Sequence, residues 1–187
     1  MALKNACTDG RVVYVSGQVD SYMLQQRRQI RELVMTNPKA DISIVISSPG
    51  GSVYGGYALM DEMAAVRAER LDPTSDVLTS FLGVVQGWAM SMGSIILQAC
   101  DRRLAGPNAL LMVHGVTSGT LGDEIGQEIH LDLVREINDR AADLYASRTV
   151  PAGGRSFRQW REILRSNVPR YFTARQALAE GLIDEVI

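Results

Sequence analysis

The chain of 187 residues has few of the residues that build metal centres and disulfide frameworks. Its two cysteines are Cys7 and Cys100, and its two histidines are His114 and His130. Neither a Cys-x-x-Cys pair nor a His-Glu-x-x-His motif occurs. Zinc sites and disulfide scaffolds need such paired residues. We therefore expect no metal ion, no cofactor and no disulfide bond.

The chain also has few lysines, a small net charge and no long apolar run. Lys4 and Lys39 are the only lysines, and the formal net charge is −2. Because there is no basic excess to neutralise phosphates, the composition argues against a non-specific nucleic-acid binder. No apolar run reaches the length of a membrane span, and residues 1–10 do not resemble a secretory leader. We expect no nucleic-acid or membrane partner, and the cytoplasm as the default compartment.

Short apolar segments alternate with helical patterns, which is typical of an α/β domain. Residues 41–47 are rich in β-branched side chains, which predicts a strand buried on both faces, as in a parallel sheet. Further strands are expected at residues 11–16, 77–81, 110–113 and 183–186, and helices at residues 21–37, 57–64, 91–98, 160–164 and 174–181. We expect residues 1–10 to form an N-terminal tail and residues 11–187 to form a single domain.

One apolar stripe at helical spacing predicts a helix over about residues 123–148. Its members lie three or four residues apart: Ile125, Ile129, Leu133, Ile137, Ala141 and Leu144. At 1.5 Å per residue the helix would be about 40 Å long, which is long for a chain of this size. Its length favours a projecting element that binds another subunit over a helix confined to the core.

Ser91 has the surroundings of a nucleophile. Serine at the start of a helix is usually a cap. Here Ala89 and Gly93 flank Ser91 at i−2 and i+2, as a sharp strand-to-helix turn requires. In such a turn the N–H of Met92 points out of the helix N-terminus and can stabilise a developing negative charge.

His114 ends the predicted strand 110–113 and is the candidate general base. A serine hydroxyl needs such a base, which histidine supplies most readily near neutral pH, although a lone histidine is more often structural. His130 falls in the middle of a helix, where it cannot easily face Ser91. The pair Gly50-Gly51 follows the strand 41–47 and is either a simple turn or a second oxyanion donor, through Gly51. Losing one such donor typically costs about 2.7–4 kcal/mol of transition-state stabilisation.

Four segments, in order, resemble the proteolytic subunit of the Clp protease family, ClpP. They are Ser48-Pro-Gly-Gly-Ser52, Ala89-Met-Ser91-Met-Gly-Ser94, Gly106-Pro-Asn108 followed by Met112-Val-His114, and Ala177-x-x-x-Gly181-Leu-Ile-Asp184. The resemblance implies a ClpP/crotonase-like α/β fold, a stack of ββα units with a protruding "handle" helix. It also implies heptameric rings that pair around a proteolytic chamber for peptides or unfolded proteins.

The same resemblance implies a role for each matching residue. Ser91 would be the nucleophile, His114 the general base, and Gly51 and Met92 the oxyanion donors. Ser52 and the loop that begins at Gly115 would bind the substrate backbone as an added strand.

The resemblance fails at three places. Pro169 stands where the family has its triad aspartate, and Asn167 lies two residues away. This leaves open a Ser–His dyad, a triad completed by Asn167 or a distant carboxylate, and an impaired enzyme. An Arg–Asp pair that links ring assembly to the site falls on Val168-Pro169. Only Met1–Gly10 precede the first strand, where the family has the segment that meets an AAA+ unfoldase, so this partner is in doubt.

Other readings are weaker. A Ser–Lys dyad would need a lysine near Ser91, and neither lysine is placed for it. An acyl-CoA enzyme of crotonase type would not need Ser91 and His114 together. A non-catalytic ring subunit or regulator that assembles with an active paralogue would need neither residue. We therefore expect a serine-type endopeptidase that cleaves peptides or unfolded proteins by acyl transfer, with the non-catalytic or impaired subunit as the alternative.

Overall fold

The computed structural model describes residues 10–119, 121, 123–166 and 168–187. The strands are β1 (Val12–Val19), β2 (Ile42–Gly51), β3 (Phe81–Met90), β4 (Arg102–Ala105), β5 (Leu110–Val113), β6 (Arg170–Thr173) and β7 (Glu185–Val186). The helices are α2 (Leu24–Thr36), α3 (Val53–Leu71), α4 (Met92–Gln98), α5 (Glu124–Thr149), the 3₁₀ turn η1 (Val150–Ala152), α6 (Phe157–Ser166) and α7 (Ala174–Glu180).

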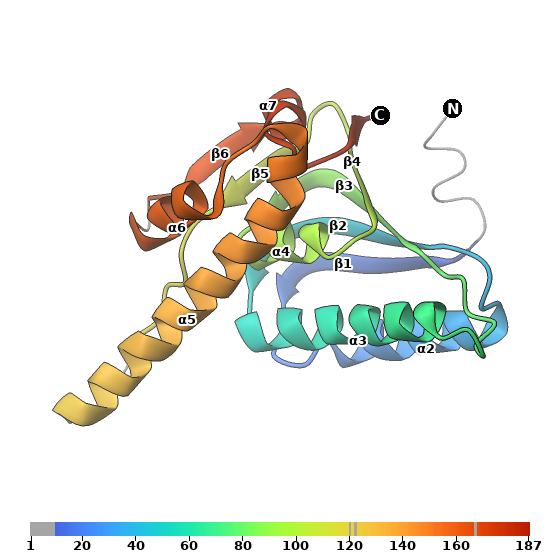
Figure 1. The fold of residues 1–187 in the computed structure, drawn as a ribbon, viewed down its shortest axis with the longest axis horizontal. Coiled ribbons are helices and arrows are strands. Elements are labelled where there is room, and N and C mark those ends of the chain that lie inside the picture. Colours follow the sequence, from blue (N-terminus) through green and yellow to red (C-terminus); the bar gives the residue numbers. More distant parts are fainter. Residues whose placement is uncertain (1–9, 120, 122, 167) are drawn as a thin grey trace.

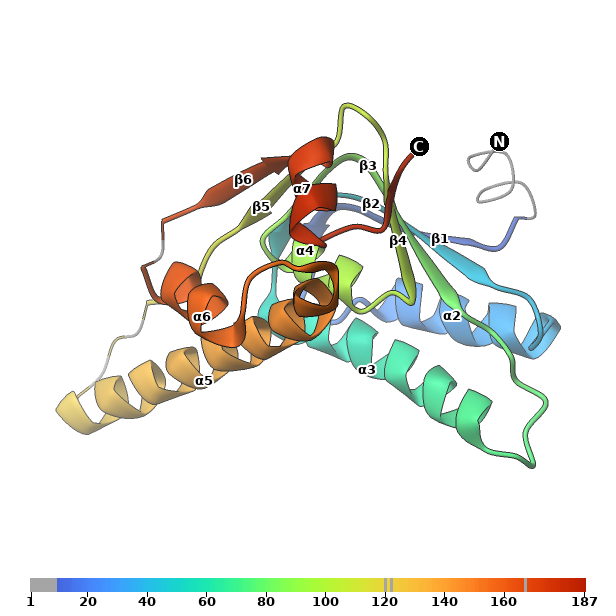
Figure 2. The same cartoon turned by 45° about the horizontal axis from the view of Figure 1, so that its top comes forward.

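The seven strands form one sheet in the order β1-β2-β3-β4-β7, with β5 pairing with β3 and β6 pairing with β5. All of these pairs are parallel except β5–β6. Helices α2 and α3 lie together below β1–β3 (Figures 1 and 2). This mixed α/β architecture, in which parallel pairs dominate, confirms the predicted fold class.

Strand β3 is forked, because it has two neighbours along the same side. Its first half, Leu82–Val85, pairs with β4, and its second half, Trp88–Met90, pairs with β5. The sheet therefore divides into a β4–β7 arm and a β5–β6 arm. Only the β5–β6 arm continues alongside the end of β3.

Strands β1, β2 and β3 bend at one level. The register of β1 with β2 shifts at Gly17 (φ 73°), and that of β2 with β3 shifts next to Ser47. A Cβ atom on Gly87 (φ 85°) would lie 3.7 Å from Ser47 Oγ, so the bend of β3 lies beside that of β2. Such irregularities increase twist and redirect a strand. They turn the carboxyl ends of β2 and β3 toward the same place.

Residues 41–47 confirm the prediction of a strand buried on both faces. Ile44 and Ile46 of β2 belong to the main core, which lies between the sheet and the helices. Val45 points to the other face, where it packs with Val84 and Leu104 in a smaller cluster. The hydrophobic contribution of these buried side chains, about 1.5–3 kcal/mol each, holds β2 at the centre of the sheet.

Helix α5 projects from the rest of the chain, as its length predicted (Figure 1). Its buried residues lie between Ile137 and Thr149, against α4 and α6. In the projecting half, Ile125 and Ile129 are 68% and 67% exposed. No helix within the described ranges is long and apolar enough to cross a membrane.

Three details of the predicted secondary structure were wrong. Val77, Thr79 and Phe81 are buried alternately, but residues 77–80 are not a strand, because the N–H groups of Leu78 and Thr79 donate to the loop carbonyl of Pro38. Helix α2 begins at Leu24, since Asp20 folds back to accept from the N–H groups that follow it. The four-residue strands β4 and β6 were not predicted.

Candidate active site

Ser91 stands at a strained turn between β3 and α4. Its backbone has φ 51° and ψ −123°, a conformation that residues other than glycine rarely adopt. Ser91 occupies the N-cap position of α4, but its side chain makes no capping hydrogen bond with the helix. Its N–H donates to the carbonyl of Met112 at 2.8 Å, which ties the turn to β5.

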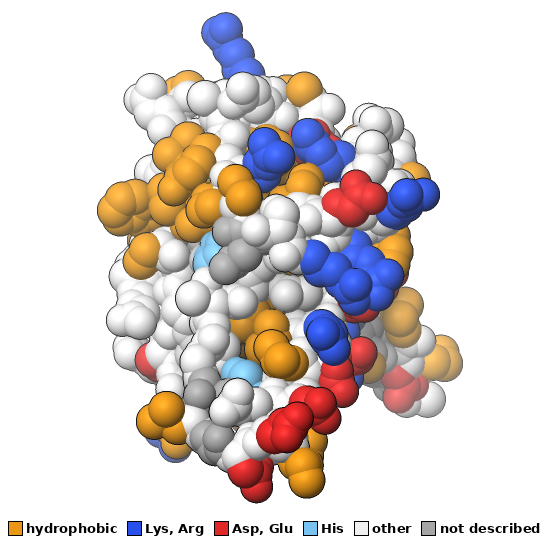
Figure 3. Space-filling model, turned by 90° about the vertical axis from the view of Figure 1, so that its left-hand side faces the viewer, with side chains coloured by type: hydrophobic (Ala, Val, Ile, Leu, Met, Phe, Trp, Pro, Cys, Tyr) orange, Lys and Arg blue, Asp and Glu red, His pale blue; other side chains and the backbone are white. Residues whose placement is uncertain are grey.

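His114 directly follows β5 and faces Ser91. Its Nε2 lies 2.8 Å from Ser91 Oγ, and both residues are half-buried. This is the distance at which an imidazole can remove a hydroxyl proton. Figure 3 shows histidine atoms, in pale blue, at two places on one face of the molecule.

Gly50 passes directly against the Ser91 turn. A Cβ atom at Gly50 would lie 2.6 Å from Ser91 Cβ, 2.9 Å from the Met90 carbonyl oxygen and 3.0 Å from Met92 N. No other residue fits there, and φ at Gly50 is 99°. The N–H of Gly50 donates to Ser48 Oγ at 3.1 Å, and that hydroxyl donates to the carbonyl of Gly17.

The two candidate oxyanion donors lie on either side of this contact. Gly51 ends β2 with φ 143°, and a Cβ atom there would clash with the Val19 carbonyl at 2.4 Å. Met92 opens α4, and its side chain is buried against Gly56. Gly51 and Met92 are chain neighbours of Gly50 and Ser91, the two residues that are in contact. Their role as oxyanion donors stays a prediction.

The sequence profile of the Clp protease family matches residues 2–187. The chain belongs to the Clp protease family. Within this family, the ATP-dependent Clp protease proteolytic subunit of Deinococcus radiodurans is 33% identical over 182 residues, which is 95% of this chain and 80% of that protein. Membership of the Clp protease family supports, in general terms, a serine peptidase that acts on peptides or proteins and assembles into oligomers. The predicted resemblance is confirmed.

Clp protease membership draws attention to residue 169, and the strand pairing shows where it lies. The antiparallel β5–β6 ladder ends with Val113 opposite Arg170. Pro169 directly precedes β6 at the end where His114 directly follows β5. Residue 169 is thus a proline and carries no carboxylate. Within the described ranges, the His114 side chain bonds to Ser91. Asn167 lies outside the described residues.

The two residues assigned to substrate binding have clear structural roles. Ser52 is the N-cap of α3, where its hydroxyl accepts from the N–H of Gly55, and its own N–H donates to the Val19 carbonyl. Gly115 is buried so closely against α6 that a Cβ atom would lie 2.0 Å from the Leu164 carbonyl oxygen. Both therefore hold the segments that leave β2 and β5. Their part in binding substrate stays a prediction.

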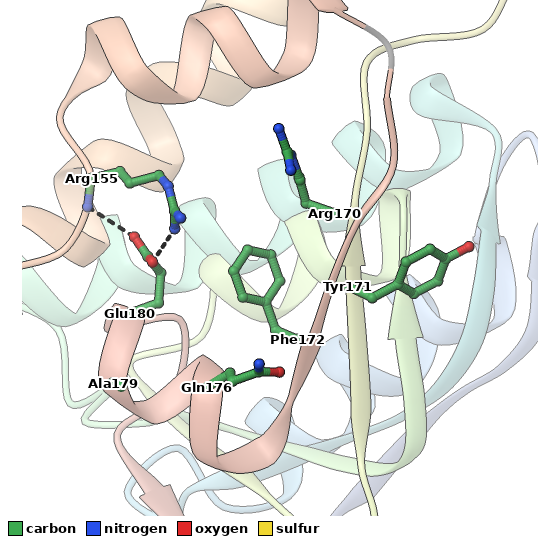
Figure 4. Close-up of a pocket in the computed structure, with 7 residues that line it drawn as sticks. All are labelled: Arg155, Arg170, Tyr171, Phe172, Gln176, Ala179 and Glu180. Carbon is green, nitrogen blue, oxygen red and sulfur yellow. Dashed lines mark hydrogen bonds and ion pairs between the residues drawn. The ribbon is translucent and has the colours of Figure 1, made fainter.

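A pocket of about 410 Å³ lies between β6 and α7, outside the Ser91–His114 pair (Figure 4). It is lined by Arg155, Arg170, Tyr171, Phe172, Gln176, Ala179 and Glu180. An ion pair between Arg155 and Glu180 spans one side of it. Arg155 also lies over the ring of Phe172, 5.8 Å from its centroid, which fixes β6 against the helices.

Proposed function

We propose that the protein is a serine endopeptidase of the Clp type, with Ser91 as nucleophile and His114 as general base. The observation that carries the proposal is the 2.8 Å contact between Ser91 Oγ and His114 Nε2 at a strained turn. Ser91 Oγ attacks the peptide carbonyl carbon while His114 takes its proton. His114 then gives the proton to the leaving amine, and water releases the acyl group by the reverse sequence.

Gly51 and Met92 provide the N–H groups that hold the oxyanion. The N–H of Ser52 points toward β1, where it binds the Val19 carbonyl. We assign the N–H of Gly51 to the other neighbour of β2, which is β3 with its Ser91 turn. A Cβ atom at Gly50 would lie 3.0 Å from Met92 N, so the Met92 N–H group borders the same turn. We propose that both donors reach the oxyanion that forms when Ser91 Oγ attacks.

The substrate binds as an extended chain between the segments that follow β2 and β5. Ser52 opens the first of these segments and Gly115 the second, and both are held rigidly. Main-chain pairing with such segments needs little side-chain specificity, which suits peptides or unfolded proteins.

We propose that Ser91 and His114 act as a dyad, because Pro169 cannot orient the imidazole through a hydrogen bond. A triad completed by Asn167 is the alternative within this mechanism. Pro169 also favours the second candidate function, a catalytically impaired ring subunit. In a serine protease, exchanging the triad aspartate for asparagine lowers kcat by about 10⁴.

Assembly follows from the projecting half of α5. Ile125, Ile129 and Leu133 form an exposed apolar stripe there, 68%, 67% and 43% exposed. Stripes of this kind mark interfaces between subunits. We propose that residues 11–187 form a single domain and that α5 joins heptameric rings in pairs around a chamber. Delivery of substrates by an AAA+ unfoldase is not part of this proposal.

Labelling with a fluorophosphonate probe tests the function. Wild type is expected to react, and Ser91→Ala and His114→Ala are not. Ser147→Ala, an exposed serine on α5, is the matched control and is expected to react like wild type. Native mass on the same samples gives the assembly. An assembled wild-type protein that stays unlabelled would overturn the peptidase in favour of a structural subunit.

A further inference from the structure

A buried hydroxyl pair connects α5 to the Ser91 turn. Ser94 Oγ donates to the Ser91 carbonyl oxygen at 2.8 Å, and Tyr145 Oη lies 2.6 Å from Ser94 Oγ. Ser94 and Tyr145 are 0% and 1% exposed. A serine hydroxyl has one proton, and a carbonyl can only accept. Since the Ser94 proton goes to the carbonyl, Tyr145 must donate to Ser94, and the relay runs from Tyr145 through Ser94 to Ser91.

The carbonyl at the end of this relay shares a peptide unit with an oxyanion donor. Ser91 C=O and Met92 N–H belong to one planar group, and no described peptide bond is cis. In a trans peptide the C=O and the N–H point in opposite directions. Ser94 holds the carbonyl on the side of α4 and α5. The N–H on the other side faces Gly50, whose Cβ position is 3.0 Å from Met92 N.

We propose that Ser94 and Tyr145 are positioning residues that aim and polarise the Met92 N–H at the oxyanion. The inference rests on the proposed function and extends it to two residues that touch neither substrate nor Ser91 Oγ. Hydrogen bonds in a chain strengthen one another, so donation to the Ser91 carbonyl makes the N–H of the same peptide a better donor. The relay also holds the turn in its strained conformation, whose cost is about 1–3 kcal/mol.

The surroundings keep Tyr145 in the protonated form that the relay needs. Burial is the main cause that raises the pKa of Tyr145 above its usual range. Its ring stacks on Trp160 with a centroid distance of 4.9 Å, in the buried base of α5. The backbone N–H groups of Ser94 and Ile95 also reach the Ser91 carbonyl, at 3.0 and 3.3 Å. The first turn of α4 therefore forms without the hydroxyls, whose removal should leave the fold intact.

The test compares Tyr145→Phe, Ser94→Ala and the double variant with wild type. Each keeps its neighbours packed, because only a hydroxyl group is removed. We expect Ser94→Ala to lower the rate constant of fluorophosphonate labelling about tenfold, less than the 10²–10³ that loss of a whole donor costs. Tyr145→Phe should lower it about threefold. The double variant should match Ser94→Ala, because the relay acts as a unit. In peptide hydrolysis kcat should fall while KM stays unchanged.

Thr149→Val is the matched control. It removes the buried hydrogen bond from Trp160 Nε1 to Thr149 Oγ1, 2.9 Å long, and the bond from Thr149 Oγ1 to the Tyr145 backbone carbonyl, also 2.9 Å. It leaves the hydroxyl groups of Tyr145 and Ser94 in place. It should lower Tm without changing the labelling rate. If wild type reacts and the relay variants react as fast as Thr149→Val, this inference is overturned while the proposed function stands. If assembled wild type does not react, the proposed function is overturned, and this inference with it.

Discussion

The contact between Gly50 and Ser91 allows a quantitative test by substitution with alanine. The new methyl group would lie 2.6 Å from Ser91 Cβ, whereas carbon atoms at rest are about 3.5–4.0 Å apart. The β2 turn and the Ser91 turn must therefore separate by about 1 Å. A misplacement of 1 Å at a reacting group can cost about 10²-fold in rate. Since Met92 N also moves, loss of its donor geometry costs about 10²–10³ in kcat.

Gly153→Ala separates this clash from the cost of the backbone alone. Gly153 has φ 83°, close to the 99° of Gly50, and a Cβ atom there meets nothing within 4 Å. Both alanine variants should lose about 1–2 kcal/mol of unfolding free energy from the left-handed backbone. Gly50→Ala should lose more, since it also moves its neighbours.

The assay is the rate of fluorophosphonate labelling, with thermal unfolding on the same samples. Gly153→Ala should label like wild type, and Gly50→Ala at least about 10² times more slowly. A folded Gly50→Ala protein that labels within a factor of three of wild type would refute the reasoning. In that case the distance between the glycine turn and Ser91 would not control reactivity.

Four further predictions follow from other parts of the chain. Pro169→Asp places a carboxylate just before β6, at the end of the ladder where His114 follows β5, and should raise peptide hydrolysis at least about tenfold, while Pro169→Ala leaves it unchanged. Ile129→Glu puts a charge on the exposed stripe of α5 and should lower the native mass, without changing the circular dichroism. Trp160→Ala empties a fully buried site and should cost about 3–5 kcal/mol in urea unfolding. Burial alone would raise the pKa of Asp184, but hydrogen bonds and the ion pair with Arg103 outweigh it and hold this pKa below its usual range. The stabilisation is thus present above the unfolded-state pKa of about 3.9 and is lost as the pH falls through the lower folded value. The excess of wild type over Asp184→Asn in unfolding free energy should therefore shrink below about pH 4, and a constant excess down to pH 2 would contradict the assignment.

The Ser91–His114 pair could be predicted because both residues end strands of one parallel sheet. The carboxyl ends of such strands meet at one edge, so a nucleophile and a base at these positions come together whatever lies between them. The helices over residues 123–148 and 174–181 could be predicted for a similar reason. An apolar stripe marks the first, and Thr173 with Gly181 caps the second.

The relay and the close approach of Gly50 could not be predicted in this way. Ser94 and Tyr145 are 51 residues apart, and no local pattern distinguishes a tyrosine that donates to a serine from one that only packs. Sequence reasoning chose Gly51 as the functional glycine, whereas the contact of Gly50 with Ser91 arises from the bend of three strands. The sequence pattern predicts that Phe81 ends a strand, whereas it begins β3. The alternating burial of Val77, Thr79 and Phe81, which is typical of a strand, occurs here mostly in a loop.

Because strand β3 is forked, the reactivity of Ser91 can report on folding. The nucleophile follows β3 itself, whereas the base follows β5 in the β5–β6 arm. The two strands are joined by a ladder of three pairs between Trp88–Met90 and Leu110–Met112, and by the bond from Ser91 N–H to the Met112 carbonyl. Neither strand carries both groups, so reactivity exists only after β5 has docked on β3. A probe that reacts with Ser91 therefore counts the molecules in which β5 is paired with β3. In a refolding experiment it would time the docking of β5.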